Sequence, residues 1–323
     1  MGDNSAIEWT DATWNPVTGC SKVSPGCAHC YAETFALTRL KGKAGYTGLP
    51  WTPENAATNV ALHEDRIEQP MRWRRPRRIF VNSLSDLFHP LVPDIFLSRL
   101  WQVMEQADHH TYQVLTKRPE RMLAFTARQL AGRAQYAADF ESCPTEAMRH
   151  SPAAREAREA YVQPAEHIWL GTSIENDRYS YRARTLALVP AAVRFLSCEP
   201  LLGPLPSLNL EGIGWVIVGG ESGPGARPMH SAWVRDIRDR CVAAGVPFLF
   251  KQWGAWQRGS EFRDDAMVMS RDGRLVAPED VGRVFLRDDP ATLGLEYIRR
   301  TTKHHAGREL DGRTWDEYPA MDA

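Results

Sequence analysis

The sequence predicts an α/β protein with a parallel barrel of the TIM type, complete or partial, built from about six or seven strands. Three observations support this prediction. Short apolar runs recur along the 323-residue chain, and helical patterns lie between several of them. The runs are continuously apolar, as in parallel strands covered on both faces. Polar residues follow each run, as they do at the strand ends that form the active site of such a barrel.

Seven strands are expected in chain order, and each is taken from one apolar run. They lie at residues 7–14, 79–81, 112–115, 168–171, 193–196, 215–218 and 247–250. An open, doubly wound sheet is the alternative arrangement of the same elements. The chain has no Gly-x-Gly-x-x-Gly after an early strand and no Walker-type loop, so the nucleotide-binding versions of that alternative are disfavoured.

Helices are expected at residues 28–40, 93–107, 119–130 and 231–244. The second has Pro93 in its first turn, and its spacing predicts a buried stripe of Ile95, Phe96, Leu100, Trp101 and Met104. The fourth begins with Ser231 as its N-cap and ends at Gly245. Its predicted buried stripe consists of Trp233, Val234, Ile237, Cys241 and Val242.

The barrel is expected to occupy residues 1–256, and a C-terminal extension at 257–323 is expected to pack on it. Two stretches have the composition of insertions. Residues 41–78 are rich in Gly, Pro and Arg, and residues 131–165 are rich in Ala, Arg and Glu, which predicts a solvated helical excursion. In the extension, Asp272-Gly273 between short apolar runs predicts a hairpin.

Charge and hydropathy exclude some classes of protein. Lys and Arg number 39 and Asp and Glu number 40, so the surface is not basic as a whole, although a local basic patch is compatible with this balance. No run of eighteen apolar residues is present, so we expect no membrane partner. The polar, acidic start of the chain is unlike a secretory signal. We therefore expect a cytoplasmic protein with reduced thiols.

The residues that follow the predicted strands are candidates for one functional cleft, because βα loops build the active site of a parallel barrel. They are Asn82, Ser83, Asp86, Lys117, Arg118, Ser173, Glu175, Asn176, Glu199, Glu221, Lys251 and Gln252. Carboxylates that face lysines in a cleft are typical of proton-transfer sites. Lys117, Glu199, Glu221 and Lys251 are therefore the candidate catalytic residues. Asp86 and Glu175 are the two whose alternative role is to cap a helix.

Three of the six cysteines form the pattern Cys20-x6-Cys27-x2-Cys30 after the first predicted strand. Pro25 and Gly26 allow the loop to turn back, so that three sulfurs can converge. Cys27 and Cys30 then enter the start of a helix, where the positive end of the helix dipole favours thiolates. Three thiolates hold three irons of a [4Fe–4S] cluster and leave the fourth iron open for a ligand such as S-adenosylmethionine.

The same three thiols also suit zinc, with His29 or His63 as the fourth ligand. A disulfide is disfavoured in a reducing compartment and would leave an odd thiol. The remaining cysteines, Cys143, Cys198 and Cys241, are isolated in the sequence and are interpreted as small core residues.

The position of the three cysteines resembles that in the radical S-adenosylmethionine superfamily, whose usual spacing is Cys-x3-Cys-x2-Cys with an aromatic residue before the third cysteine. This chain differs in two respects, because its first gap is six residues and His29 takes the aromatic position. The Cys-x2-Cys half and the helix that follows it are retained.

A longer series of motifs, spread over nearly the whole chain, resembles a family of phage-associated proteins that is described by a three-cysteine motif and treated as radical-SAM-like. The motifs are WNPVTGC (residues 14–20), SPGC (24–27), CYA (30–32), NSLSDLF (82–88), LTKRP (115–119), LSCEPLL (196–202), VGGESG (218–223), FKQWG (250–254) and LDGR (310–313). This resemblance implies the barrel fold and a [4Fe–4S] cluster on the three cysteines. It implies no substrate.

The superfamily resemblance also implies positions for a bound S-adenosylmethionine. Asn82 and Ser83 end the second strand, where the superfamily binds the methionyl amino group, and Asp86 is counted with them. Ser173 and Glu175 end the fourth strand, where contacts to the ribose or carboxylate lie. Gly219 and Gly220 end a later strand and would let a ligand approach the backbone.

The hypothesis drawn from these features is an enzyme that cleaves S-adenosylmethionine reductively, with an electron donor such as a flavodoxin or ferredoxin. A nucleotide or nucleic acid is considered as its substrate. The alternative is a zinc-stapled barrel that binds nucleic acid or a protein partner without redox chemistry, and a metal-independent hydrolase or lyase is the third hypothesis. Residues 72–78, with five arginines and a tryptophan, precede a strand and therefore belong at the bottom of the barrel, away from the chemistry. A phosphate-binding patch with a stacking tryptophan is the alternative interpretation, and docking of a large nucleic acid there stays open.

Overall fold

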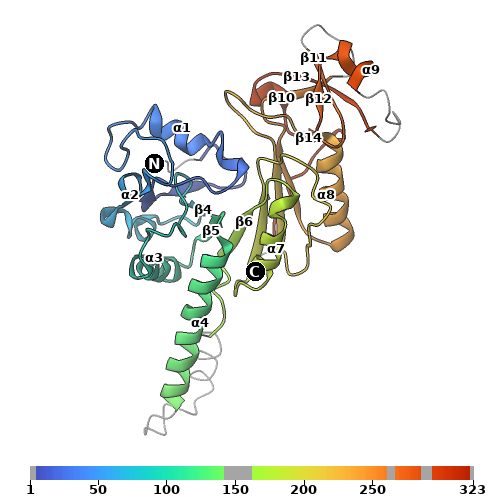
Figure 1. The fold of residues 1–323 in the computed structure, drawn as a ribbon. Helices are drawn as coiled ribbons and strands as arrows, with labels where there is room; N and C mark the ends of the chain where they lie inside the picture. Colours follow the sequence, from blue (N-terminus) through green and yellow to red (C-terminus); the bar gives the residue numbers. More distant parts are fainter. Residues whose placement is uncertain (1–4, 142–161, 260–265, 285–292, 321–323) are drawn as a thin grey trace.

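The computed structural model describes residues 5–141, 162–259, 266–284 and 293–320. Its centre is a curled sheet of seven parallel strands (Figure 1). They are β1 (Ala12–Trp14), β4 (Arg78–Val81), β5 (Thr111–Thr116), β6 (Ile168–Ser173), β7 (Val193–Cys198), β8 (Trp215–Gly219) and β9 (Phe248–Gln252). The strands follow one another across the sheet in chain order without a reversal, which is barrel order and excludes the doubly wound alternative. β1 and β9 form the two edges, so the barrel is partial.

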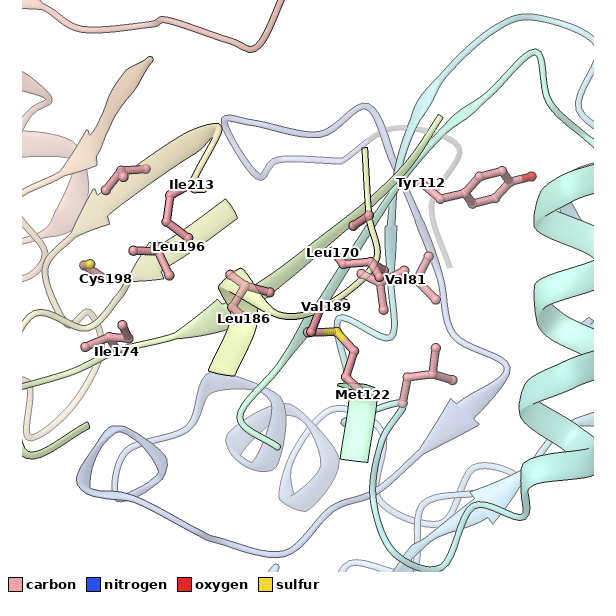
Figure 2. Packing of buried hydrophobic residues seen from close by; sticks show 14 of the residues in the cluster. Val81, Tyr112, Met122, Leu170, Ile174, Leu186, Val189, Leu196, Cys198 and Ile213 are labelled. Carbon is pink, nitrogen blue, oxygen red and sulfur yellow. The ribbon is translucent and has the colours of Figure 1, made fainter. Parts of the chain in front are cut away.

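The strands read as continuous apolar runs because both faces of the sheet are buried. Successive side chains on a strand point to opposite faces. The outer face packs under the helices, and Figure 2 shows Leu170 and Leu196 of this face with Met122 of α4 and Leu186 of α7. The inner face carries a second cluster, made of Trp9, Phe80, Trp169, Phe195, Trp215, Ile217 and Leu249. The half-barrel is therefore filled at its base.

The longer helices cover the outer face. They are α3 (Asp94–Gln106), α4 (Pro119–Glu141) and α8 (Ser231–Ala244), together with the short α7 (Tyr181–Ala187). A further short helix, α1, spans Tyr31–Leu37. Two residues assigned to buried stripes are in fact exposed. Ile95 is 72% exposed and Val242 is 59% exposed. The α3 stripe instead includes Leu97 and Val103, because the face that meets the sheet is rotated away from Ile95.

Helix ends also differ from the sequence prediction. Pro93 is the N-cap of α3 and not a first-turn residue. His230, and not Ser231, caps α8, because its Nδ1 accepts the Ala232 backbone N–H at 3.0 Å. Ser231 donates instead to the Glu296 carboxylate. Gly245 ends α8 as predicted, in the left-handed conformation with φ of 66°.

The first predicted insertion contains only short elements. β2 (Val17–Thr18) pairs with β3 (Ala61–Leu62), and α2 spans Ala56–Asn59. Single 3-10 turns lie at Glu64–Arg66 and Pro70–Arg72 here, and at Pro25–Cys27, Asp177–Tyr179 and Pro278–Asp280 elsewhere. The second insertion begins as a continuation of α4, and residues 142–161 of it, including Cys143, lie outside the described residues.

The end of the chain forms an antiparallel sheet in the order β10 (Trp256–Gly259), β13 (Glu296–Arg300), β11 (Ala266–Met269) and β12 (Leu275–Val276). The predicted hairpin at Asp272-Gly273 joins β11 to β12, and Gly273 has a φ of 94°. The remaining elements are α9 (Val281–Val284), α11 (Lys303–Ala306) and the hairpin of β14 (Glu309–Leu310) with β15 (Arg313–Thr314). No helix among the described residues is long and apolar enough to cross a membrane.

The last described residues return to the open side of the half-barrel. Asp316 forms a bridge with Leu249 of β9, and Trp215 Nε1 donates to the Glu317 carbonyl at 2.8 Å. The Tyr318 hydroxyl donates to the carbonyl of Glu8, in the segment that precedes β1, at 3.2 Å. The two ends of the described chain thus meet between the edge strands of the sheet.

Replacing Asp311 with Asn is expected to weaken the attachment of the β14–β15 hairpin to α8. Hydrogen bonds from Arg235 hold the pKa of Asp311 down, at about 2 instead of 3.8, with Arg238 adding to the effect. A lowered pKa contributes stability above the unfolded value of 3.8 that is lost as the pH falls toward 2. Because the side chain is 37% exposed, solvent screening reduces the contribution to about 1 kcal/mol.

Thermal unfolding as a function of pH tests this expectation. Asp311→Asn should lower the melting temperature at neutral pH, and the difference should vanish in acid. Asn tolerates the positive φ of 54° at this position, so the substitution adds no backbone strain. Asp280→Asn, in an exposed pair with Arg283, is the control and should have no measurable effect. A pH-independent loss in Asp311→Asn would contradict the electrostatic account.

Candidate functional site at the strand ends

A cavity of about 500 Å³ lies at the carboxyl ends of the parallel strands. Its size is within the range of small-molecule sites. Alternation along the strands explains its lining, because the side chains that continue the inner face beyond Phe80, Leu115 and Phe195 are polar. The predicted residues that line it are Asn82, Ser83, Asp86, Lys117, Arg118, Ser173, Glu199, Gly220, Glu221 and Lys251. The structure therefore brings most of the candidate residues to one place.

All three cysteines of the motif line this cavity. Each is free of a disulfide. Cys27 lies in the turn Pro25–Cys27, and Cys30 is the N-cap of α1. Burial raises the pKa of Cys30, although the Ala32 and Glu33 amides oppose this and favour the thiolate. Burial, followed by the charge of Asp86, raises the pKa of Cys20 to about 12, and Arg118 opposes it.

Glu175 lies beneath the cysteine loop, where it is completely buried. Ser24 Oγ donates to its Oε1 at 2.5 Å, and Lys117 Nζ is 2.6 Å from the same oxygen. Arg182 Nη1 lies 3.3 Å from Oε2. Burial alone would raise the pKa of Glu175, but the Lys117 charge and hydrogen bond outweigh it, so the pKa is lowered. The carboxylate is therefore an ionised anchor for the loop.

Gly26 allows this anchor to sit so close. A Cβ at Gly26 would lie 2.5 Å from Glu175 Cγ, which is closer than real contacts. The predicted role of Pro25 and Gly26 was to turn the loop. The structure adds that the glycine also makes room for the buried carboxylate.

Asp86 forms a second support, on the Cys20 side. Its carboxylate accepts from Arg118 Nη1 at 2.7 Å, from the Thr116 hydroxyl at 2.6 Å and from the Lys117 backbone N–H at 3.1 Å. The same Arg118 Nη1 lies 3.7 Å from Cys20 Sγ. Arg118 therefore links the second predicted strand end to the first cysteine, and its charge faces that sulfur.

Glu221 contacts the cysteine loop from another side, through His29 and Arg227. Its carboxylate accepts from Arg227 at 2.5 Å and 2.8 Å and from His29 Nδ1 at 3.2 Å. Burial would raise the pKa of Glu221, but the hydrogen bonds from Arg227 lower it. Arg227 Nη2 also donates to the Pro25 carbonyl at 3.0 Å. The segment after β8 is thus fastened to the loop that carries Cys27.

Glu199 and Lys251 form an ion pair within the cavity lining, with Nζ and Oε1 2.6 Å apart. Their side chains are 20% and 14% exposed. Of the two predicted glycines, Gly219 faces Glu199, with an ideal Cβ 3.2 Å from its carboxyl carbon. Gly220 meets the backbone of the next loop, since a Cβ there would lie 2.2 Å from the Trp253 carbonyl oxygen. Close packing of two loops thus requires glycine at residue 220.

Two buried donors in the cavity lining have no partner among the described residues. Asn82 has a φ of 60°, and its Oδ1 accepts the Val17 N–H at 3.4 Å, which leaves Nδ2 unused. Trp9 Nε1 is the second unused donor. Asn82 is 1% exposed and Trp9 is 2% exposed. Unpaired buried donors are costly, so these two favour a ligand with acceptors in the cavity.

The residues fit a cluster held by three cysteines. The three thiols share one cavity, backbone amides face Cys30, and the Arg118 guanidinium faces Cys20. Positive groups of this kind stabilise thiolate ligands. Each cysteine of such a cluster binds a separate iron. Within residues 5–141, 162–259, 266–284 and 293–320, no three His, Cys, Asp or Glu side chains are grouped to share one metal ion.

The two histidines considered as fourth zinc ligands have other partners. His63 Nε2 and Thr18 Oγ1 share a hydrogen bond of 2.8 Å, and His29 donates to Glu221. Cys198 and Cys241 are completely buried, as expected of core residues.

The structure adds residues that the sequence reasoning did not select. Trp9, Phe80 and Leu115 form apolar parts of the lining, and Tyr31 and Phe35 of α1 lie at its exposed part. Strand alternation is a signal that could have found Phe80 and Leu115. Arg182 and Arg227 had no such signal, because their partners come from distant parts of the chain.

Comparison with known proteins gives a family match over nearly the whole chain. A family model described as "Protein of unknown function (DUF5131)" matches residues 4–319. No curated protein matches the chain. Among solved structures, one variant of spore photoproduct lyase is 12% identical, with a TM-score of 0.34, and covers 88% of this chain and 74% of its own. A variant with bound AdoMet and dinucleoside spore photoproduct is 11% identical, with a TM-score of 0.31, and covers 85% of this chain and 76% of its own.

Proposed function

Since the chain belongs to the DUF5131 family of proteins of unknown function, its activity is argued from its own site, and we propose an iron–sulfur enzyme of the radical S-adenosylmethionine type. The observation that supports this proposal is the shared cavity of three free thiols and an unused buried donor, Asn82 Nδ2. The thiols would hold a cluster, and the donor faces a site of small-molecule size.

Cys20, Cys27 and Cys30 would hold the [4Fe–4S] cluster. When bound, the cluster supplies an open iron that binds S-adenosylmethionine and an electron that cleaves a C–S bond of that molecule. The electron donor would be a flavodoxin or ferredoxin. Phage association and a cytoplasmic location also stay predictions.

The protein residues bind, orient and shield. Asn82 Nδ2 is a donor, so it would bind an acceptor such as a carboxylate oxygen of S-adenosylmethionine. Ser173, with a hydroxyl in the same lining, would offer a second polar contact. Trp9, Phe80 and Leu115 provide apolar walls that keep water away from a reactive species. Gly220, already packed against Trp253, would contribute only its backbone.

The four candidate catalytic residues divide into two kinds. Lys251 and Glu199 share the cavity lining and are 2.6 Å apart, so they are the pair that would move a proton to or from a substrate. Lys117 is held by Glu175, and Glu221 is held by Arg227. We therefore assign Lys117 and Glu221 to positioning the cysteine loop and the ligand beside it.

The experiment is metal analysis of protein purified without oxygen, followed by incubation with S-adenosylmethionine and a reductant. About four irons and four sulfides per chain are expected, together with formation of 5′-deoxyadenosine. One zinc per chain without iron would contradict the proposal and favour a zinc-stapled barrel. Iron without any cleavage of S-adenosylmethionine would retain the cluster and refute the reaction.

A further inference from the structure

The exposed part of the cavity lining carries two aromatic side chains on one face of α1. Tyr31 is 51% exposed and Phe35 is 41% exposed. They are four residues apart and therefore lie one turn apart on the same helix face. Both also line the cavity. An occupant that covers them on the outside is therefore continuous with one inside.

Cations follow these aromatic residues. Arg39 lies over the Phe35 ring, 5.3 Å from its centroid, and Lys41 and Lys43 come directly after in an exposed loop. In residues 20–52 the single carboxylate is Glu33, which is buried and pairs with Lys22 at 2.9 Å. Across the described chain, no ion pair is formed by Arg39, Lys41 or Lys43. This segment is thus locally basic in a chain with a net charge of −1.

The cavity itself is different, because its cations are already paired. Lys117, Arg118, Lys251 and Lys303 each lie within 2.7 Å of a carboxylate, from Glu175, Asp86, Glu199 and Glu8 in turn. The apolar wall of Trp9 and Phe80 carries one unused donor, Trp9 Nε1. The inside thus suits a neutral, flat group with a hydrogen-bond acceptor, and the outside suits negative charge.

We infer that this surface binds single-stranded nucleic acid, with phosphates on Arg39, Lys41 and Lys43 and bases stacked on Tyr31 and Phe35. One base enters the cavity. Charged phosphates outside and a neutral planar base inside match the division of charge described above. Single-stranded nucleic acid would then be the substrate of the proposed enzyme. Its role as a substrate rests on the proposed function, whereas its binding to this surface does not.

Two other occupants fit less well. A free nucleotide has a single base, so it cannot stack on Tyr31 and Phe35 and fill the cavity at the same time. A globular acidic protein seated on Tyr31 and Phe35 would cover the cavity that they line. A nucleic-acid strand can stack bases on Tyr31 and Phe35 and also fill the cavity, because one nucleotide can turn inward while its neighbours stay outside.

The test is fluorescence anisotropy of a labelled single strand of about twelve nucleotides, a length within the usual site size, added to iron-loaded full-length protein. Deoxyribose and ribose strands are compared, and salt is titrated. Three phosphate contacts should give a slope of log K against log salt of about −2, since each contributes about −0.7. Phe35→Ala, which changes no charge, should weaken binding by roughly tenfold through lost stacking.

The triple variant Arg39→Glu, Lys41→Glu, Lys43→Glu should weaken binding by at least about tenfold and bring the salt slope close to zero. The matched control is Arg72→Glu, Arg74→Glu, Arg75→Glu, which makes the same change of charge at exposed residues before β4. Its binding should stay within about twofold of the unchanged protein, because these arginines lie at the opposite end of the strands.

Three results would overturn the inference. The first is iron-loaded protein that binds no oligonucleotide at low salt, which would leave the proposed function intact. The second is an equal loss of binding in both triple variants. The third is a flavodoxin that binds through Arg39, Lys41 and Lys43 while oligonucleotides do not. Oligonucleotide binding by protein that contains zinc and no iron would support the surface and refute the proposed function instead.

Discussion

Replacing Cys27 with alanine is expected to reduce the iron content from about four atoms per chain to nearly none. Cys27 is the middle cysteine of the motif, and the turn before it is held by two contacts, Ser24 to Glu175 and Arg227 to the Pro25 carbonyl. With one ligand of three absent, the two remaining thiols cannot hold a cluster stably. The loss should be visible as a missing brown absorption and in iron and sulfide assays.

The control for this experiment is Cys241→Ala. Cys241 is completely buried in α8 and does not line the cavity, so its replacement should leave the iron content unchanged. Thermal unfolding of both variants separates a lost ligand from a lost fold. If Cys27→Ala retains the full spectrum of the unchanged protein, the ligand assignment is wrong.

Replacing Glu175 with glutamine is expected to cost about 3–5 kcal/mol of stability, because it removes the anion shared by a buried arginine and a partly buried lysine. Arg182 is 2% exposed, so water cannot replace its partner, and Lys117 is 19% exposed. Ser24 also loses its charged acceptor. We therefore expect a lower iron content in this variant, even though all three cysteines are present.

The pH dependence distinguishes the charge of Glu175 from its shape. Its pKa is lowered below the ordinary 4.5, so the ionised anchor stabilises the fold above that pH and is lost as the pH falls below it. The difference in unfolding free energy between Glu175→Gln and the unchanged protein should therefore shrink in acid. Urea unfolding at several pH values measures it.

The matched variant is Glu199→Gln, which leaves one cation, Lys251, without its anion, where Glu175→Gln leaves two. Glu199 is itself 20% exposed, whereas Glu175 is completely buried and also holds Arg182, which is 2% exposed. Its stability loss should be smaller than that of Glu175→Gln, and its iron content should be unchanged. Equal stability of Glu175→Gln and the unchanged protein would mean that Glu175 is not the anchor of the loop.

Much of the site was predictable because strands impose a strict alternation. Phe80 lies on the inner face of β4, and Asn82 follows directly after the strand. Phe195 and Ser197 share the inner face of β7, and Glu199 follows it. Once the runs are read as parallel strands, their carboxyl ends must meet at one edge of the sheet. The grouping of the candidate residues follows from that geometry, without knowledge of any contact.

Helix details were less predictable, for a physical reason. The 3.6-residue period defines a stripe but not the angle at which it meets the sheet, so Ile95 and Val242 were assigned to the wrong side. At the start of α8, two neighbouring residues, His230 and Ser231, could each have capped the helix. His230 accepts the helix N–H because Glu296, from a strand 65 residues away, engages Ser231.

The amino-acid sequence alone predicts a parallel barrel, complete or partial, with a three-cysteine loop after its first strand and polar residues at its strand ends. These follow from local periodicity and spacing, which act over a few residues. The structure was needed to show that the barrel is partial, that Glu175 supports the loop, that Asp86 and Arg118 support Cys20, and that Trp9 and Asn82 carry unused donors. Such roles depend on side chains that are far apart in the chain, such as Ser24 and Glu175, and no local pattern specifies which of them will meet.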